Sequence, residues 1–193
     1  MNIVNVGYDS TNYYVLADKT PRLLIDVGFP NTLSKLEHQC KRMNIRLTDI
    51  KHLLATHYHP DHAGLVPELQ RLGCKLIVME NQLSAVPELA KHLKPHEQFT
   101  GIDLKNALTL TLADSRAFLA RLGITGEIIA TPGHSDDSVT LVLDEGAAFT
   151  GDLTHPLVMG EDAPQALHDS WARLRALGVT TIYGGHGPTW RLA

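Results

Sequence analysis

One stretch constrains this chain more than any other: residues 56–64, with the sequence Thr-His-Tyr-His-Pro-Asp-His-Ala-Gly. Three imidazoles and one carboxylate fall within six consecutive positions of it. The mostly apolar residues 52–55 just before it predict a short buried strand. Leucines at 65, 69 and 72 predict a helix that ends near Gly73. We therefore expect a strand-to-helix turn, a place where a rigid scaffold holds side chains over a cleft.

The composition of this turn indicates metal binding. His57 and His59 are two residues apart, a spacing that puts both rings on one face of an extended segment. Asp61 and His62 follow at the start of the helix and can point back toward a second position. Packing explains such a group poorly, because buried polar side chains without partners are costly. One metal ion would use only part of this set, whereas two would use all of it.

The rest of the chain alternates strands with helices, which is the α/β pattern. Strands are expected at residues 2–6, 13–17, 22–26, 50–55, 75–79, 127–131, 138–143, 147–150 and 179–183. One helix is expected to start at an Asn31 cap with Leu33, Leu36, Cys40 and Met43 on its buried stripe. Further helices are expected at residues 80–93 and 115–122. A last helix has Ala166, Leu167, Trp171, Leu174 and Leu177 inward and ends at Gly178. His92 and His96 are expected to face solvent.

The motif H-x-H-x-D-H within residues 56–62 resembles the signature of the metallo-β-lactamase superfamily. Four other segments resemble further motifs of that family in the same order, and the resemblance covers nearly the whole chain. They are Leu-Ile-Asp-Val-Gly at residues 24–28, Thr-Pro-Gly-His-Ser at 131–135, Phe-Thr-Gly-Asp at 149–152 and Gly-Gly-His-Gly-Pro at 184–188. The resemblance implies a four-layered αβ/βα sandwich with halves centred near His62 and His134.

The resemblance also implies a set of metal ligands. One ion would be held by His57, His59 and His134, the other by Asp61, His62 and His186, with Asp152 bridging the two. Imidazole and carboxylate ligands without cysteine suit zinc, and also iron or manganese. Asp26 and Thr56 are candidates for supporting the ligands, since metal-bound histidines usually donate their other N–H to a carboxylate or carbonyl. From the residues alone, a turn carboxylate at a strand end is an equal alternative for Asp26.

The chemistry expected from two divalent ions is hydrolysis. They would lower the pKa of a shared water to about 7, and the resulting hydroxide would attack an ester, thioester, lactone or related bond. The ions would then stabilise the charge that develops on the attacked oxygen. Asp61 is the candidate catalytic residue, because it can orient the nucleophile or carry its proton to the leaving group.

Three side chains are candidates for contacting substrate. Tyr58 lies between the first two histidines, a position from which its side chain could face the cleft. His155 follows Asp152 by three residues, and a plain loop histidine is its alternative. Tyr8, in the loop at residues 7–10, is expected to be a solvated side chain, with a position in the cleft wall as the alternative.

Other functions stay open at this stage. The ending at residues 184–188 resembles hydroxyacylglutathione-hydrolase-like members of the family. The helical domain that binds glutathione in glyoxalase II enzymes has no counterpart in the sequence, so glutathione thioesters are not favoured. Lactonase, phosphodiesterase and β-lactam hydrolysis are alternatives. A second class is a mononuclear iron oxidoreductase, because persulfide dioxygenases carry the same histidine-rich motif. A third is a metal-binding module without catalysis.

Length and charge limit the partners. At 193 residues the chain is long enough for one substantial core, so we expect a single domain over 1–193. A net charge of -4 argues against a nucleic-acid surface. No apolar run approaches a membrane span, and no secretion signal is recognised. We expect a cytoplasmic protein that acts on a small molecule, with a homodimer left open. Cys40 and Cys74 are expected to be buried free thiols.

Overall fold

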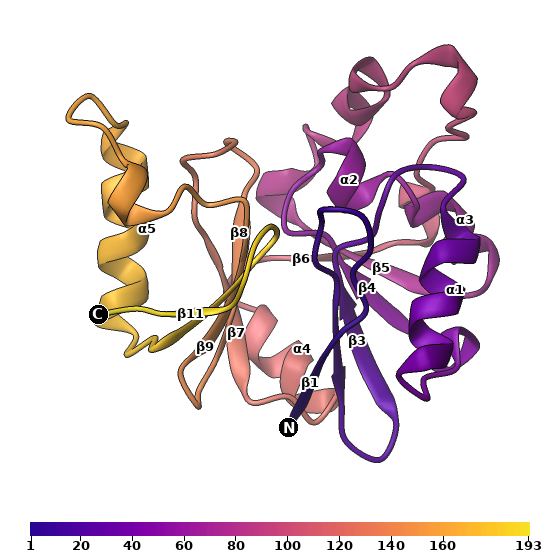
Figure 1. The fold of residues 1–193 in the computed structure, drawn as a ribbon, viewed down its shortest axis with the longest axis horizontal. Helices are drawn as coiled ribbons and strands as arrows, with labels where there is room; N and C mark the ends of the chain where they lie inside the picture. Colours follow the sequence, from indigo (N-terminus) through magenta and orange to yellow (C-terminus); the bar gives the residue numbers. More distant parts are fainter.

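The computed structural model describes residues 1–193 apart from the side chain of Pro21. Two β-sheets pack face to face and carry helices on their outer faces (Figure 1). The first sheet has six strands in the order β1 (Asn2–Asn5), β2 (Tyr14–Ala17), β3 (Pro21–Ile25), β4 (His52–Leu54), β5 (Lys75–Met79) and β6 (Leu108–Leu110). The second has five, in the order β11 (Trp190–Arg191), β10 (Thr181–Gly184), β9 (Ala147–Gly151), β8 (Val139–Leu143) and β7 (Gly126–Ala130).

The helices cover the two sheets from outside. α1 (Leu33–Arg42) and α3 (Val66–Arg71) lie against the first sheet, and α5 (Gln165–Ala176) lies against the second (Figure 1). The short α2 (Pro60–Ala63) sits at one edge, and α4 (Ser115–Arg121) packs along β7. This arrangement confirms the four-layered αβ/βα sandwich expected from the sequence. Among the described residues, no helix has both the length and the apolar character needed to cross a membrane.

Alternation along the strands divides the apolar side chains between the layers. In β5, Ile77 and Met79 point into the core between the sheets, where they join Leu141 of β8. The intervening Val78 faces the other way, into the core beneath α1 and α3. Both faces of the strand are therefore buried, and this explains why residues 76–79 are all apolar.

Strand direction brings the ends of the central strands to one edge. The first three strands are antiparallel, but β3 pairs parallel to β4, and β9 pairs parallel to β10. The carboxyl ends of each parallel pair therefore lie side by side. The chain segments that leave these ends carry most of the predicted site residues.

Several expected elements differ in detail. α1 is capped at Thr32 instead of Asn31, which adopts a left-handed backbone with a φ of 62°, and Met43 beyond the helix is exposed. The helix expected up to residue 72 is divided into α2 and α3 at residues 64–65.

Residues 80–93 form the 3₁₀ turns Glu80–Gln82 and Val86–His92 instead of an α-helix. Pro87, which has no N–H to donate, lies in the second of these turns. The strands β6 and β11 were not predicted, because three and two residues are too few to show a period. Ala166 of α5 and Leu177 just beyond its end are exposed, whereas Trp171 is buried as expected. Both cysteines are free and buried, as predicted.

Candidate metal centre

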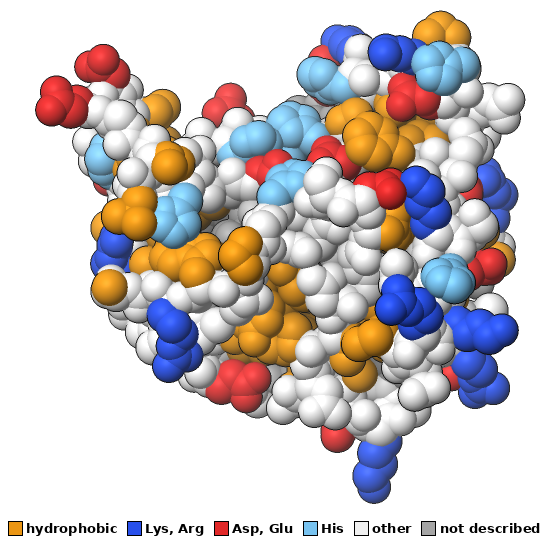
Figure 2. Space-filling view, viewed as in Figure 1, with side chains coloured by type: hydrophobic (Ala, Val, Ile, Leu, Met, Phe, Trp, Pro, Cys, Tyr) orange, Lys and Arg blue, Asp and Glu red, His pale blue; other side chains and the backbone are white. Residues whose placement is uncertain are grey.

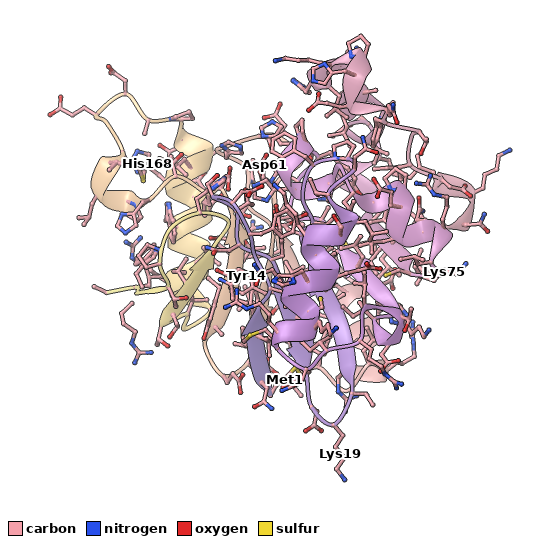
Figure 3. All side chains as sticks on the ribbon, turned by 45° about the vertical axis from the view of Figure 1, so that its right-hand side comes forward. Met1, Tyr14, Lys19, Asp61, Lys75 and His168 are labelled. Carbon is pink, nitrogen blue, oxygen red and sulfur yellow. The ribbon has the colours of Figure 1, made fainter. Side chains whose placement is uncertain are left out.

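Seven side chains from both halves of the molecule converge at the edge where the parallel strands end. Asp61 lies at this edge in Figure 3, and Figure 2 shows histidines and acidic side chains gathered there in a hollow. The seven side chains form two groups, and within each group the ligand atoms lie within 4.8 Å of one another. The first group is His57, His59 and His134, and the second is Asp61, His62, Asp152 and His186. The structure thus brings together all seven ligands predicted from the sequence, in the same two groups.

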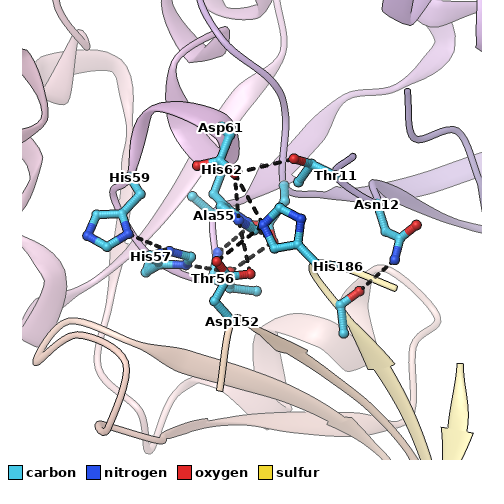
Figure 4. A network of polar contacts seen from close by, with 12 residues as sticks. Thr11, Asn12, Ala55, Thr56, His57, His59, Asp61, His62, Asp152 and His186 are labelled. Atoms are coloured by element: carbon cyan, nitrogen blue, oxygen red, sulfur yellow. Dashed lines mark hydrogen bonds and ion pairs between the residues drawn. The ribbon is translucent and has the colours of Figure 1, made fainter. Parts of the chain in front are cut away.

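Local structure explains how one turn supplies four of them. β4 ends at Leu54, and the chain bends at Thr56 and His57 before it reaches His59, whose φ and ψ are -89° and 157°. Pro60 is the first residue of α2, a position where its missing N–H costs nothing. His57 and His59 therefore project from the segment before the helix, while Asp61 and His62 project from the first helical turn (Figure 4).

The ring nitrogens of the first group face one point. Nε2 of His57 lies 3.1 Å from Nδ1 of His59, and Nε2 of His134 lies 3.0 Å from that same Nδ1. Ligand atoms on a tetrahedral zinc ion are about 3.3–3.4 Å apart. The three nitrogens therefore have nearly the spacing that one ion requires.

The second group is arranged around two carboxylates. Nε2 of His186 lies 3.3 Å from Oδ2 of Asp61 and 3.3 Å from Oδ2 of Asp152. Nε2 of His62 lies 3.2 Å from Oδ1 of Asp152 and 3.5 Å from Oδ2 of Asp61. Asp152 also faces the first group, since its Oδ2 is 3.8 Å from Nε2 of His134. It is the residue that lies between the two groups.

Hydrogen bonds orient three of the histidine rings, so that one nitrogen of each ring faces the site. His62 donates from Nδ1 to Asp26 at 2.9 Å, and His186 donates from Nδ1 to the carbonyl of Ser10 at 2.7 Å. The Thr56 hydroxyl donates to Asp26, so it accepts from Nδ1 of His57 at 3.1 Å. In all three rings Nε2 is left as the nitrogen that can bind a metal. Asp26 and Thr56 therefore occupy the supporting positions that were expected of them.

The backbone is also strained at this place. Asp26 adopts a φ of 60°, which is rare for a residue other than glycine, and its Oδ1 accepts the N–H of Thr56 at 2.6 Å. Gly151 has a φ of 52°, and a Cβ there would collide with the Thr56 hydroxyl. A Cβ at Gly185 would collide with Oδ1 of Asp152. These two glycines let the second sheet approach the ligands of the first.

The N-terminal loop supports the site in a way that the sequence did not reveal. The Thr11 hydroxyl donates to Oδ2 of Asp61 at 3.3 Å, and the carbonyl of Ser10 holds His186 (Figure 4). The side-chain amide of Asn12 donates to the carbonyls of Gly184 and Gly187, on either side of His186. The three residues belong to no local motif, and their partners lie up to 176 residues away.

A buried glutamine under the histidine turn was also missed. The amide of Gln82 donates to the carbonyls of Ala55, Thr56 and Asp137 at 3.1–3.2 Å, and its oxygen accepts the N–H of Met79. The Asp137 carboxylate in turn accepts the N–H of Tyr58 at 2.8 Å. Together they tie the turn at residues 55–58 to the second sheet. A polar residue just after an apolar strand was the one signal in the sequence.

The first ligand group is electrically suited to a cation. Burial, followed by the charge of His62, lowers the pKa of His57 well below its usual value. Burial, followed by the neighbouring His134, lowers the pKa of His59. Both rings are thus neutral near pH 7, as metal ligation requires.

The second ligand group is held by paired charges. For His62, burial favours the neutral ring, but Asp26 and Asp152 outweigh it and raise the pKa of His62 to about 10. Burial opposes the charge of Asp152, but His62, His57 and His186 hold its pKa well below the usual range. A bound cation would take the place of the proton on His62, because metal binding releases protons from its ligands.

Two orphaned atoms test whether the site suits a metal. Nε2 of His62 and Oδ1 of Asp152 are buried and lie 3.2 Å apart as an ion pair, but neither atom makes a hydrogen bond of good geometry among the described residues. A buried polar atom without a partner is costly. A divalent ion in contact with both would satisfy them, and the imidazole and carboxylate donors suit zinc, iron or manganese. The residues present therefore fit a metal centre.

The candidates for substrate contact have different positions. Tyr58 is 2% exposed and packs in the core under α1 and α3, so the interpretation that it faces the cleft is wrong. Tyr8 is buried instead of solvated: its hydroxyl bonds that of Thr32 at 2.6 Å, and its ring packs on Tyr13. Both tyrosines belong to the apolar cluster that packs beneath the helices of the first sheet. His155 is half-buried and lines a cavity together with His134, Asp152 and His186.

His92 and His96 are exposed, as expected. The ring of His92 nevertheless lies only 5.8 Å from that of His59, measured between ring centroids. The 3₁₀ turn Val86–His92 carries it to the rim of the site. No pattern in the sequence indicated this proximity, because it depends on how the turn folds back over α2.

Comparison with known proteins agrees with this geometry. A lactamase-like protein of Neosartorya fischeri is 31% identical over 92% of this chain and 48% of its own length. An atrochrysone carboxyl ACP thioesterase of Aspergillus fumigatus is 31% identical over 92% of this chain and 37% of its own. The chain thus spans about half the length, or less, of these curated relatives.

Solved structures show the same fold. A metallo-beta-lactamase family protein from Thermus thermophilus superposes with a TM-score of 0.75 at 21% identity, covering 98% of this chain and 74% of that one. The family model of the metallo-beta-lactamase superfamily matches residues 6–186, a span that includes all seven site residues. With the motifs, the two ligand groups and the fold in agreement, the chain belongs to the metallo-beta-lactamase superfamily.

Proposed function

We propose that this protein is a metal-dependent hydrolase with a dinuclear centre, acting on an ester, a thioester or a lactone. The observation that carries the proposal is the position of Asp152, which faces His62 and His186 on one side and His134 on the other. One carboxylate between two complete ligand groups is the arrangement that two neighbouring cations need. Zinc is the metal we favour, because both groups offer nitrogen and oxygen donors in a tight cluster.

The residues that would hold the ions follow from the two groups. His57, His59 and His134 would hold one, Asp61, His62 and His186 the other, and Asp152 both. When bound, such ions supply Lewis acidity toward the attacked oxygen and lower the pKa of a water to about 7. The residues behind the ligands keep the rings aimed, so that little reorganisation is needed during the reaction.

Asp61 is the residue we assign to proton transfer. The Thr11 hydroxyl bonds its Oδ2, which also faces His62 and His186, so Oδ1 is the oxygen available for the proton. In hydrolysis the water oxygen bonds to the carbonyl carbon, the bond to the leaving group breaks, and the proton of the water passes to the leaving group. Asp61 at the edge of the site would carry this proton.

The relatives support hydrolysis at the general level. One of them is named a thioesterase, and this motivates the choice of acyl substrates for the first assays. The chain corresponds to 37% of that relative, so its particular substrate is not transferred to this protein.

The test is metal content followed by a substrate panel. Protein purified without chelator should hold about two zinc or manganese ions per chain. Asp152→Ala should lose them, whereas Asp162→Ala, at an exposed carboxylate in the loop before α5, should keep them. The loaded protein should hydrolyse esters, thioesters or lactones, and phosphodiesters complete the panel.

A single iron per chain that survives Asp152→Ala would overturn the dinuclear hydrolase. Oxygen uptake with persulfides would then become the relevant assay. If the protein hydrolyses phosphodiesters but none of the acyl substrates, the proposed metal centre stands, but the proposed substrate class is wrong.

A further inference from the structure

A cavity of about 470 Å³ opens directly beside the metal centre. Asp152 and His186 of the centre line it together with His155, Val158 and Trp190. Its volume falls in the range of small-molecule sites. Figure 2 shows hydrophobic side chains near the histidine cluster, on the part of the surface toward α5. Metal coordination does not account for this cavity, since most of its lining lies outside the two ligand groups.

Two aromatic side chains of the cavity lining, His155 and Trp190, contact each other with their rings tilted by 45°. The His155 ring lies 4.0 Å from that of Trp190, and Trp190 lies 5.6 Å from Trp171, between ring centroids. Trp171 is buried, and its indole N–H donates to the carbonyl of Thr154 at 2.8 Å. Trp190 thus contacts both His155 and the buried Trp171, and these contacts restrict the position of its ring.

His155 contributes one polar atom to the cavity lining. Its Nδ1 accepts the N–H of Leu157 at 3.1 Å, which fixes the proton of the neutral ring on Nε2. A ring locked in this way can pack flat against an apolar group and donate one hydrogen bond.

The rim and the charge of the cavity point to an apolar occupant. Leu157 and Val158, in the 3₁₀ turn Pro156–Val158, are 89% and 72% exposed. Val158 lines the cavity, and its exposed side chain is free to contact an apolar occupant. No lysine or arginine is among the described residues that line the cavity. An anionic substituent such as a phosphate or a peptide carboxylate would therefore find no counter-charge there.

We propose that this cavity receives an uncharged, ring-containing substituent of the substrate, packed against Trp190 and His155 and covered by the turn at Val158. The scissile bond joined to this substituent then lies at Asp152 and His186. The assignment rests on the proposed hydrolase function and narrows its substrates to acyl compounds with an apolar ring.

The test compares two carboxylates that differ in the ring alone: acetate and 1-naphthylacetate, titrated into the full chain loaded with zinc. Calorimetry should give naphthylacetate a Kd about tenfold or more below that of acetate, because only the ring buries apolar surface. Trp190→Ala should remove most of this difference, and Val158→Ser part of it. Leu104→Ala, at an exposed apolar side chain in the 3₁₀ turn Leu104–Asn106, should leave it unchanged.

Fluorescence provides a second readout, because the chain has two tryptophans. Naphthylacetate should change the emission of the wild-type protein, and Trp190→Phe should lose most of this change while keeping much of the affinity. Circular dichroism checks that the variants are folded. Equal affinity for the two carboxylates, or a preference that survives Trp190→Ala in folded protein, would overturn the assignment.

The two proposals fail in different ways. If naphthylacetate binds with the expected preference but no ester or thioester is hydrolysed, the cavity assignment stands and the hydrolase function is wrong. If acetyl and naphthylacetyl esters are hydrolysed with equal kcat/KM, the hydrolase function stands and the cavity assignment is wrong.

Discussion

Asp26 and His62 share a hydrogen bond of 2.9 Å between Oδ2 and Nδ1, and both side chains are buried. The same Oδ2 accepts the Thr56 hydroxyl at 2.8 Å, which in turn contacts Nδ1 of His57. One carboxylate therefore orients a ring in each of the two ligand groups. The centre behaves as one unit because its two halves are supported by a common residue.

Asp26→Asn should therefore weaken both halves of the centre. The amide keeps the size of the side chain but has only one acceptor oxygen for the three hydrogen bonds that the carboxylate now accepts. We expect zinc affinity to fall by about 10–100-fold, the usual cost of losing such a partner. Competition against a chromophoric chelator measures it. Asp18→Asn, at an exposed carboxylate, is the matched control, and equal affinities in the two variants would rule out the supporting role.

Gly151→Ala should damage stability and metal binding together. The new Cβ meets the Thr56 hydroxyl, and the φ of 52° is unfavourable for alanine. Strain and overpacking should cost about 2–4 kcal/mol in the free energy of unfolding. Gly178→Ala is the control: its φ is 72°, but a Cβ there meets nothing within 4 Å, so only the backbone cost of about 1 kcal/mol is expected. Urea unfolding compares the two. Equal losses would show that contact with Thr56 is unimportant.

Four of the site residues, His57, His59, Asp61 and His62, were predictable because they share one short turn. The other three, His134, Asp152 and His186, were predicted from the resemblance of their motifs to those of a known family. The residues that support these side chains were harder to predict. Gln82 reaches partners 26 to 55 residues away, and Thr11 reaches Asp61 across 50 residues. Such contacts depend on how the layers pack, and no local periodicity encodes them.

Tyr58 and Tyr8 show that the position of a side chain also could not be predicted from its neighbours in the sequence. Tyr58 lies between two site histidines, yet its side chain points into the core, where it joins the apolar cluster beneath α1 and α3. Proximity in sequence to a ligand therefore did not imply proximity to the cleft. The overall fold was easier to predict from the sequence, because alternating strands and helices with apolar central strands are compatible with few arrangements of layers.

Gln82→Met should destabilise the protein without removing any ligand. The amide now donates to three buried carbonyls, and methionine offers no donor. The Thr56 carbonyl keeps the N–H of Val139, but the carbonyls of Ala55 and Asp137 would lose this donor, which should cost about 2–4 kcal/mol in the free energy of unfolding. Urea denaturation of the metal-free protein isolates this effect. Gln165→Met, at the exposed start of α5, should change stability by less than about 0.5 kcal/mol. A Gln82→Met variant as stable as this control would contradict the proposed tie between turn and sheet.

The two thiols should make the protein sensitive to alkali. Burial raises the pKa of Cys40 to about 11 and that of Cys74 to about 12. An unfolded thiol titrates near about 8.5, so above that pH the unfolded chain has released protons that the folded protein still holds. The free energy of unfolding should therefore be unaffected by these groups below about pH 8 and should fall as the pH rises toward 11–12.

Urea unfolding near pH 8 and near pH 10 measures this slope, and Cys74→Ala should flatten it. A thiol reagent offered to the folded protein near pH 8 should react slowly, and both cysteines should react at once when the chain is unfolded. Fast labelling of the folded protein would show that the thiols are accessible. A slope unchanged by Cys74→Ala would assign the alkaline loss to other groups, such as Tyr8, whose pKa burial raises to about 12.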